Sequence, residues 1–260
     1  MAVLVELFGL PGSGKSFLAH ALLRRLKEQH INALDRPTAV RLCLQRRNDG
    51  PLMAVLKKLP YLFWGRLIHE HHCLPELLNF FARYPALAAL YQQDLSRSSA
   101  LESSRRNLLG AFAASCVERQ LVDIFGAANE LILADEGFCH RFFTLYGNLA
   151  IARSHAETEQ YLDVLPPLSG AIFVASPAGL CLERMQQRKR LPVLLHHLAA
   201  EQRMAILRHG EELLHKLAIA LPQRGIPCYI YDGISLEISP MISFCQARIL
   251  QEEHECASAC

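Results

Sequence analysis

Near its start the chain reads Gly9-Leu10-Pro11-Gly12-Ser13-Gly14-Lys15-Ser16, which fits the pattern G-x-x-x-x-G-K-[ST]. Glycines let the main chain adopt conformations that other residues avoid, so backbone N–H groups can come close to an anion. In such a loop the Lys15 ammonium reaches the β- and γ-phosphates of a nucleotide, and the Ser16 hydroxyl holds Mg2+. We therefore predict that this loop binds a nucleoside triphosphate, ATP, together with Mg2+.

The residues on both sides of the loop support that prediction. Val3 to Phe8 is a mostly apolar run, typical of a buried strand. Phe17 to Gln29 has apolar residues on one face and charged residues off it, which predicts an amphipathic helix. A strand, a glycine-rich loop and a helix in this order place the helix N-terminus under the phosphates, so we count Phe17 among the nucleotide-binding residues. We expect Lys15 to lie on an exposed loop.

Length and composition limit the class of protein. The 260 residues are 51% hydrophobic, enough for a substantial core in one or two domains. A formal charge of +2 argues against general nucleic-acid binding. Nine cysteines without CxxC pairs, and no secretory signal, predict mostly buried thiols in a reducing cytoplasm. No apolar run approaches the roughly 18–20 residues needed to cross a bilayer, so no membrane partner is expected.

Strand-like and helix-like segments alternate along the rest of the chain, which predicts a parallel sheet covered by helices on both faces. After the first strand, further strands are expected at 31–34, 130–136, 171–175 and 226–232. Helices are expected at 38–48, 51–70, 75–94, 100–128, 141–165, 180–190, 196–221 and 237–253. Five strands with right-handed helical crossovers make a three-layer α/β/α domain, whose ligand lies at the carboxyl ends of the strands. We assign 1–250 to this single domain, 36–128 to a helical insertion within it and 251–260 to a C-terminal tail.

Three carboxylates follow predicted strands and are expected in the crevice beside the glycine-rich loop. Asp135 ends the third strand, where a carboxylate can hold Mg2+ from the side opposite Ser16. Glu136 is open to two interpretations, a water polariser in an ATPase or a substrate-binding group in a kinase. Asp35 follows the second strand, where it either accepts the proton from an attacking hydroxyl or caps the next helix.

A basic helix is expected after the fourth strand. Arg184 and Arg188 are four residues apart and therefore share one helix face, and Arg190 follows them. Guanidinium groups on a mobile segment can close over the γ-phosphate and neutralise its developing charge. The alternative is a solvated helix end, stabilised by the helix dipole.

The insertion 36–128 carries twelve Lys/Arg against seven Asp/Glu, a net charge of +5. This excess favours an anionic small-molecule acceptor, although solvated helix faces explain it equally well. The apolar run Leu59 to Trp64 is interpreted as core of the insertion; the alternative is a cover over an aromatic or lipid-like acceptor, or contact with a membrane surface.

These residues resemble the P-loop kinases of nucleosides, nucleoside monophosphates and other small molecules, such as thymidylate kinases and deoxynucleoside kinases. The matching parts are the loop, Asp135 with His140-Arg141 after it, and 171–188, which looks like the family's strand and arginine-bearing lid. The resemblance covers about 1–35 and 129–250; it implies the P-loop NTPase fold with strand order 2-3-1-4-5, and an acceptor bound by the insertion. Thymidylate kinases have Asp-Arg after the third strand and deoxynucleoside kinases Glu-Arg-Ser, whereas this chain has Asp135-Glu136-Gly137.

The sequence therefore predicts an ATP-dependent phosphotransferase that moves the γ-phosphoryl group to a small molecule, a nucleoside, nucleotide or other hydroxyl or phosphate compound. Its catalytic residues are predicted to be Lys15, Asp35, Glu136, Arg184 and Arg188. Two alternatives stay open: an ATPase in which Glu136 polarises water, and a regulator that binds the nucleotide without turnover.

Overall fold

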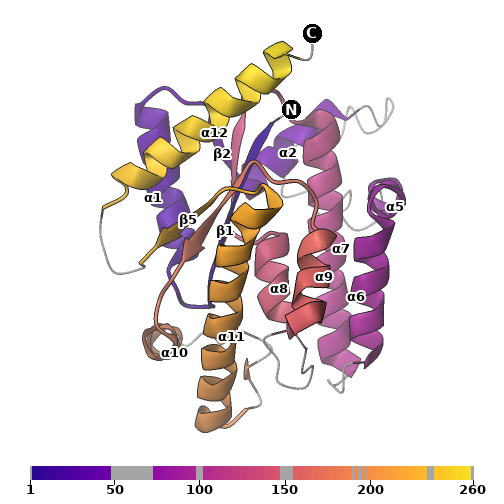
Figure 1. Ribbon diagram of the computed structural model, residues 1–260, viewed down its shortest axis with the longest axis vertical. Coiled ribbons are helices and arrows are strands. Elements are labelled where there is room, and N and C mark those ends of the chain that lie inside the picture. Colours follow the sequence, from indigo (N-terminus) through magenta and orange to yellow (C-terminus); the bar gives the residue numbers. More distant parts are fainter. Residues whose placement is uncertain are drawn as a thin grey trace.

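In the computed structural model the described residues are 2–47, 73–97, 102–146, 155–188, 191–192, 195–196, 198–232 and 237–258. The centre is a five-stranded parallel sheet of order β2-β3-β1-β4-β5, as the resemblance implied (Figure 1). Its strands are β1 (Val3–Phe8), β2 (Ala33–Asp35), β3 (Leu131–Ala134), β4 (Gly170–Val174) and β5 (Cys228–Tyr231). The fold is thus the predicted α/β class, with β1 central and the glycine-rich loop at its carboxyl end.

Helices connect the strands and cover the sheet. They are α1 (Lys15–Glu28), α2 (Arg36–Arg46), α5 (Leu74–Arg83), α6 (Pro85–Arg97), α7 (Glu102–Phe125), α8 (Phe138–Tyr146), α9 (His155–Asp163), α10 (Ala178–Gln187), α11 (Ala200–Ala220) and α12 (Ser239–Ser258). A short 3₁₀ turn, η2 (Leu221–Arg224), follows α11. Between β2 and β3 the chain is helical wherever it is described, as expected for the insertion, apart from short connections.

The two faces of the sheet are covered by different helices (Figure 1). Successive strand side chains point to opposite faces, so Val5 and Leu7 of β1 pack with α1 and α12 on one side. Leu4 and Phe8 pack on the other side, in the larger core formed with α2, α7, α8 and α11. Both sets of β1 side chains are buried, which is why this strand is almost continuously apolar.

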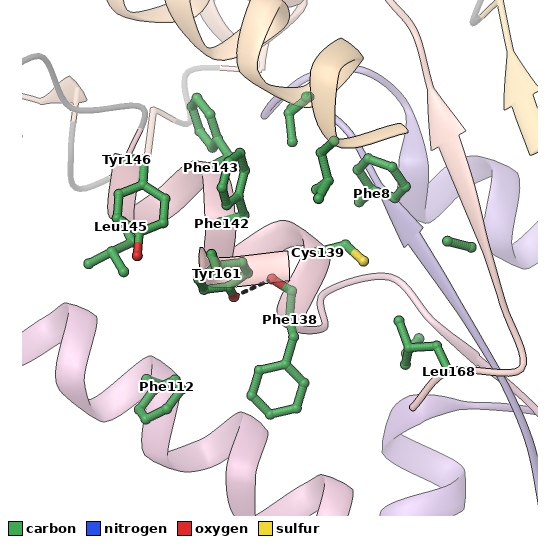
Figure 2. Packing of buried hydrophobic residues seen from close by; sticks show 14 of the residues in the cluster. Phe8, Phe112, Phe138, Cys139, Phe142, Phe143, Leu145, Tyr146, Tyr161 and Leu168 are labelled. Carbon is green, nitrogen blue, oxygen red and sulfur yellow. Dashed lines mark hydrogen bonds between the residues drawn. The ribbon is translucent and has the colours of Figure 1, made fainter. Parts of the chain in front are cut away.

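An aromatic cluster in the larger core holds α8, which carries part of the candidate site (Figure 2). Phe142 lies against Tyr161 of α9, with ring centroids 5.1 Å apart. The Tyr161 hydroxyl donates a hydrogen bond to the carbonyl oxygen of Phe138 at 2.8 Å. Phe138, at the start of α8, also stacks on Phe80 of α5 at 5.6 Å. Packing and a satisfied buried hydroxyl therefore fix the start of α8 against its neighbours.

Several predicted boundaries differ from the structure. The single helix expected at 75–94 is two helices, α5 and α6, because Pro85 cannot donate the helical hydrogen bond and begins a new helix. The helix expected at 141–165 is α8 and α9, with residues 147–154 outside the described part. α12 runs to Ser258, through most of the predicted tail, since Gln251 to Glu255 are mainly good helix formers. The helix expected at 51–70 and the run Leu59 to Trp64 lie outside the described residues.

The described cysteines form no disulfide with one another, and all but Cys228 are buried, in line with the predicted buried thiols. In the same part of the chain, no helix combines the length and apolar character required to cross a bilayer.

Candidate active site

The glycine-rich loop follows β1 and leads directly into α1. Gly12 and Gly14 have positive φ angles of 83° and 101°, and Gly14 is the residue from which α1 begins. A Cβ at Gly12 would lie 2.5 Å from the carbonyl oxygen of Cys181 in α10, so a larger residue is excluded by both conformation and space. The loop therefore has the compact backbone path that brings N–H groups toward an anion at a helix N-terminus.

Lys15 lies beneath this loop. Its Nζ donates hydrogen bonds to the carbonyl oxygens of Gly9 and Leu10, both at 3.0 Å, and the residue is 8% exposed. The prediction of an exposed Lys15 is therefore wrong, because the ammonium folds back onto the loop. Burial lowers the pKa of Lys15 to about 8, and the negative charge of Glu136 acts in the opposite direction.

Ser16 and Asp135 come together at the adjoining strand ends. The Ser16 hydroxyl donates a hydrogen bond to Asp135 Oδ2 at 2.9 Å. A hydroxyl and a carboxylate are the oxygen ligands that Mg2+ accepts, and Mg2+ sites in proteins use one or two such groups beside phosphate and water. The pair therefore fits the predicted magnesium site in its chemistry and in its place beside the loop.

The segment after β4 contacts the loop from the other side. The carbonyl oxygen of Ser13 accepts hydrogen bonds from Ser176 Oγ at 3.0 Å and from Arg184 Nη1 at 3.2 Å. Arg184 therefore contacts the glycine-rich loop. Arg188 is exposed at the end of α10, and within the described residues it has no hydrogen bond or ion pair to the loop. Phe17, in the first turn of α1, is 72% exposed.

Asp35 has a local partner. Its carboxylate accepts a hydrogen bond from the backbone N–H of Thr38 at 2.9 Å, and Asp35 is the N-cap of α2. Pro37, inside the first turn, also favours a helix start at this point. Of the two interpretations of Asp35, the structure provides the contact expected for the helix cap.

A cavity of about 320 Å³ opens beside the loop. The residues that line it are Pro11, Gly12, Lys15 and Ser16 of the loop region, Ser104, Asn107, Leu108 and Ala111 of α7, Glu136, His140, Arg141, Phe143 and Thr144 at the end of β3 and in α8, and Pro192. Asp35 is not among them. The cavity therefore joins the predicted phosphate site to the last helix of the insertion.

Glu136 is the carboxylate that faces this cavity. Its side chain is 46% exposed, and its Oε2 lies 3.6 Å from Nη2 of Arg141. Its backbone carbonyl accepts a hydrogen bond from Arg36 Nη1 at 3.1 Å, and the same nitrogen lies 3.2 Å from Glu118 of α7. Arg36 therefore fixes the segment after β3 to the insertion, while the Glu136 carboxylate stays accessible.

Glu6 is a site-forming residue that the sequence interpretation missed. It is buried in β1, and its two carboxylate oxygens accept hydrogen bonds from the backbone N–H groups of Phe138 and Cys139, both at 2.9 Å. These groups begin α8, so the carboxylate satisfies donors that the helix itself leaves unpaired. A Cβ at Gly137 would overlap the Glu6 carboxylate, which explains the glycine after Asp135-Glu136. The available signal was a charged residue within an apolar strand.

His140 and Arg141, which entered the sequence analysis only through the resemblance, belong to the cavity wall. His140 is buried, and among the described residues its Nδ1 has no hydrogen-bond partner. Burial is the main reason why the pKa of His140 lies well below its ordinary value, and the charges of Lys15 and Arg141 lower it further. The imidazole is therefore neutral near pH 7.

No protein-family model and no curated protein sequence matches the chain. Solved structures do resemble it. The deoxyadenosine kinase from M. mycoides with bound dATP has a TM-score of 0.46 and 12% identity over 95% of this chain and 99% of that one. The same kinase with bound dCTP has a TM-score of 0.42 and 13% identity, over 96% of this chain and 100% of that one. With the products dCMP and dCDP bound, its TM-score is 0.38 and its identity 14%, over 98% of this chain and 100% of that one.

Proposed function

We propose that this protein is an ATP-dependent phosphotransferase that moves the γ-phosphoryl group to a small molecule bound in the cavity. One observation carries the proposal: the same 320 Å³ space is lined by Lys15 and Ser16 of the phosphate loop and by Glu136 and α7 on the facing side. A phosphoryl donor on the loop and an acceptor in the cavity would therefore share one space, as direct transfer requires.

The loop would bind the triphosphate of ATP. Its backbone N–H groups and the α1 N-terminus attract the phosphates, and Lys15 would exchange its two carbonyl partners for phosphate oxygens. Ser16 and Asp135 would hold Mg2+, which when bound neutralises part of the phosphate charge. Arg184, which donates a hydrogen bond to the Ser13 carbonyl oxygen of the loop, would stabilise charge on the transferred group.

Glu136 would orient the acceptor. For a hydroxyl acceptor, its oxygen forms a bond to the γ-phosphorus while the bond from that phosphorus to the β–γ bridging oxygen breaks. ADP leaves with the electron pair of the broken bond, and the acceptor proton passes to the Glu136 carboxylate. We assign this role to Glu136 rather than Asp35 because Glu136 lines the cavity, whereas Asp35 caps α2.

ATP hydrolysis is the second candidate function. The 46% exposure of the Glu136 side chain is the observation that favours it, because water can reach this carboxylate. In that case water takes the place of the acceptor hydroxyl, and Glu136 accepts its proton.

Turnover assays separate the two functions. The protein is incubated with Mg2+ and [γ-32P]ATP, with and without a panel of nucleosides, nucleotides and other hydroxyl compounds, and labelled products are resolved from free phosphate. We expect acceptor-dependent transfer that falls at least about 100-fold in Glu136→Gln and is largely retained in Asp35→Asn. Acceptor-independent phosphate release that collapses in Glu136→Gln supports the ATPase.

Two controls make the assay interpretable. Lys15→Ala should remove both activities, and Glu28→Gln, an exposed carboxylate in α1, should change neither. Calorimetry that detects no binding of ATP or GTP with Mg2+ would remove both functions together.

A further inference from the structure

Arg141 is held in a fixed orientation at the wall of the cavity. Its Nε donates a hydrogen bond to Ser115 Oγ of α7 at 3.0 Å, and that hydroxyl donates to the carbonyl oxygen of Ala111 at 3.1 Å. The side chain is 9% exposed. These two hydrogen bonds orient the guanidinium through its Nε–H group, which leaves the two Nη groups available to donate to other partners.

Those Nη groups have no hydrogen bond within the described part of the chain. The nearest carboxylate oxygen, Glu136 Oε2, lies 3.6 Å from Nη2, beyond normal hydrogen-bond distance. The Glu136 side chain is also half-exposed, so water solvates its carboxylate and screens its charge. A buried guanidinium normally has close partners for its charge and donors. Arg141 is therefore a buried cation that lines a cavity without a complete set of partners.

The arginines of the insertion differ from Arg141 in this respect. Arg47 of α2 pairs with Glu76 at 2.9 Å, and Arg83 of α5 pairs with Asp123 at 3.0 Å. Further insertion arginines with carboxylate partners are Arg36, Arg46 and Arg119. Five of the described insertion arginines are thus held in internal ion pairs, whereas Arg141, which lines the cavity together with Lys15, lies outside the insertion, in α8.

The rest of the lining describes the shape of a suitable ligand. Among the described residues that line the cavity, the cations are Lys15 of the glycine-rich loop and Arg141, and the anion is Glu136. The remaining α7, α8 and loop residues are uncharged, with an apolar wall that includes Leu108 and Phe143. The space therefore suits a compact carbon skeleton that carries one anionic group.

We propose that the acceptor carries, besides the group that is phosphorylated, a carboxylate or phosphate that Arg141 binds. This inference rests on the proposed function, because it takes the cavity as the acceptor site. A guanidinium and a carboxylate or phosphate form paired, charge-assisted hydrogen bonds, which the two Nη groups of Arg141 are placed to donate. Arg141 is then the residue that selects acidic acceptors over neutral ones of the same shape.

A binding experiment tests this without turnover. The protein is saturated with ADP and Mg2+, so that the phosphate loop is filled, and titrated in a calorimeter with phenyl phosphate, benzoate and benzyl alcohol. The three probes share a phenyl group and differ in charge. We expect at least one anion to bind about tenfold or more tightly than benzyl alcohol, the effect of one charged hydrogen bond. The tighter anion identifies the group as phosphate or carboxylate.

Variants locate the effect. Arg141→Gln should reduce the preference for the anion to about threefold or less, whereas Arg25→Gln, the same charge change on the exposed side of α1, should leave it unchanged. Arg141→Lys keeps the charge and should keep part of the preference, which provides a test should the glutamine variant not fold. Circular dichroism melting of each variant checks folding.

The outcomes are distinct. Wild-type protein that does not prefer either anion over benzyl alcohol, or a folded Arg141→Gln protein that keeps the full preference, would overturn the proposal. If Arg141 only positioned Glu136, its replacement would lower turnover and leave anion binding unchanged. An anion preference without phosphoryl transfer to any acceptor would leave the anion site in place and remove the proposed function instead.

Discussion

Replacing Glu6 with glutamine should weaken the attachment of α8 to the sheet. In the structure both carboxylate oxygens accept backbone N–H groups, from Phe138 and Cys139, at 2.9 Å. The glutamine oxygen can keep one of these bonds, but its NH2 group must face the other donor. The variant therefore loses one charge-assisted hydrogen bond inside the protein and places two donors against each other.

The expected cost follows from these contacts. A hydrogen bond to a charged group contributes about 1.5–3 kcal/mol, and a negative charge at a helix N-terminus adds about 0.3–1 kcal/mol. Glutamine is neutral, so the variant no longer pays for burying a charge, which offsets part of this loss. We therefore expect a net loss of about 2–3 kcal/mol of unfolding free energy. This loss is a large share of the unfolding free energy of a typical domain, roughly 5–15 kcal/mol, yet we expect the variant to remain folded.

Urea unfolding followed by far-UV circular dichroism measures the loss. The midpoint should fall with an unchanged slope, and Glu28→Gln on the exposed face of α1 should stay within about 0.5 kcal/mol of wild type. Gly137→Ala provides a second check, because its Cβ overlaps the Glu6 carboxylate. The loss of unfolding free energy caused by Gly137→Ala should be smaller in a Glu6→Ala background, because the shorter side chain leaves space for the new Cβ. The reasoning would be refuted if Glu6→Gln lowered the unfolding free energy by less than about 0.5 kcal/mol. It would also be refuted if Gly137→Ala cost the same with glutamate and with alanine at position 6.

Three further predictions concern the proposed nucleotide site. Asp35→Ala should lower the unfolding free energy by about 1 kcal/mol, as for a lost helix cap, with a change in kcat of less than about threefold in steady-state assays. ATP phosphates favour the charged form of Lys15, whose pKa in the free protein is about 8. Calorimetry should therefore show full ATP affinity below pH 8 and an affinity that falls by up to about tenfold per pH unit above it. Lys15→Met should not show this pH dependence. Gly12→Ala, with its Cβ against Cys181, should abolish measurable ATP binding in the same titrations.

The parts of the site that were predictable are local in sequence. The glycine-rich loop depends on eight consecutive residues between a strand and a helix, and the structure has that arrangement. The cap role of Asp35, one of two interpretations, involves Thr38 three positions away. The element types were also predictable, since the strands and helices follow from hydrophobic pattern and length, whereas the strand order came from the resemblance.

The parts that were missed depend on contacts between distant positions. Glu6 meets the start of α8 more than a hundred residues later, and no local pattern specifies that partner. Arg141 is oriented by Ser115, on a helix of the insertion that reaches the cavity only through tertiary packing. The burial of Lys15 has the same origin, because the ammonium is enclosed only once the loop and its neighbours pack together.

The segment Asp135-Glu136-Gly137, where the chain departs from the kinases that it resembles, supports one consistent interpretation. Asp135 accepts a hydrogen bond from Ser16 beside the glycine-rich loop, Glu136 faces the cavity, and Gly137 leaves the space that the Glu6 carboxylate needs at the start of α8. Two arginines approach Glu136: Arg36 donates a hydrogen bond to its backbone carbonyl oxygen, and Arg141, from within α8, lies 3.6 Å from its carboxylate. Of the two, Arg141 is the one that lines the cavity, and for that reason we expect it to act on the proposed acceptor.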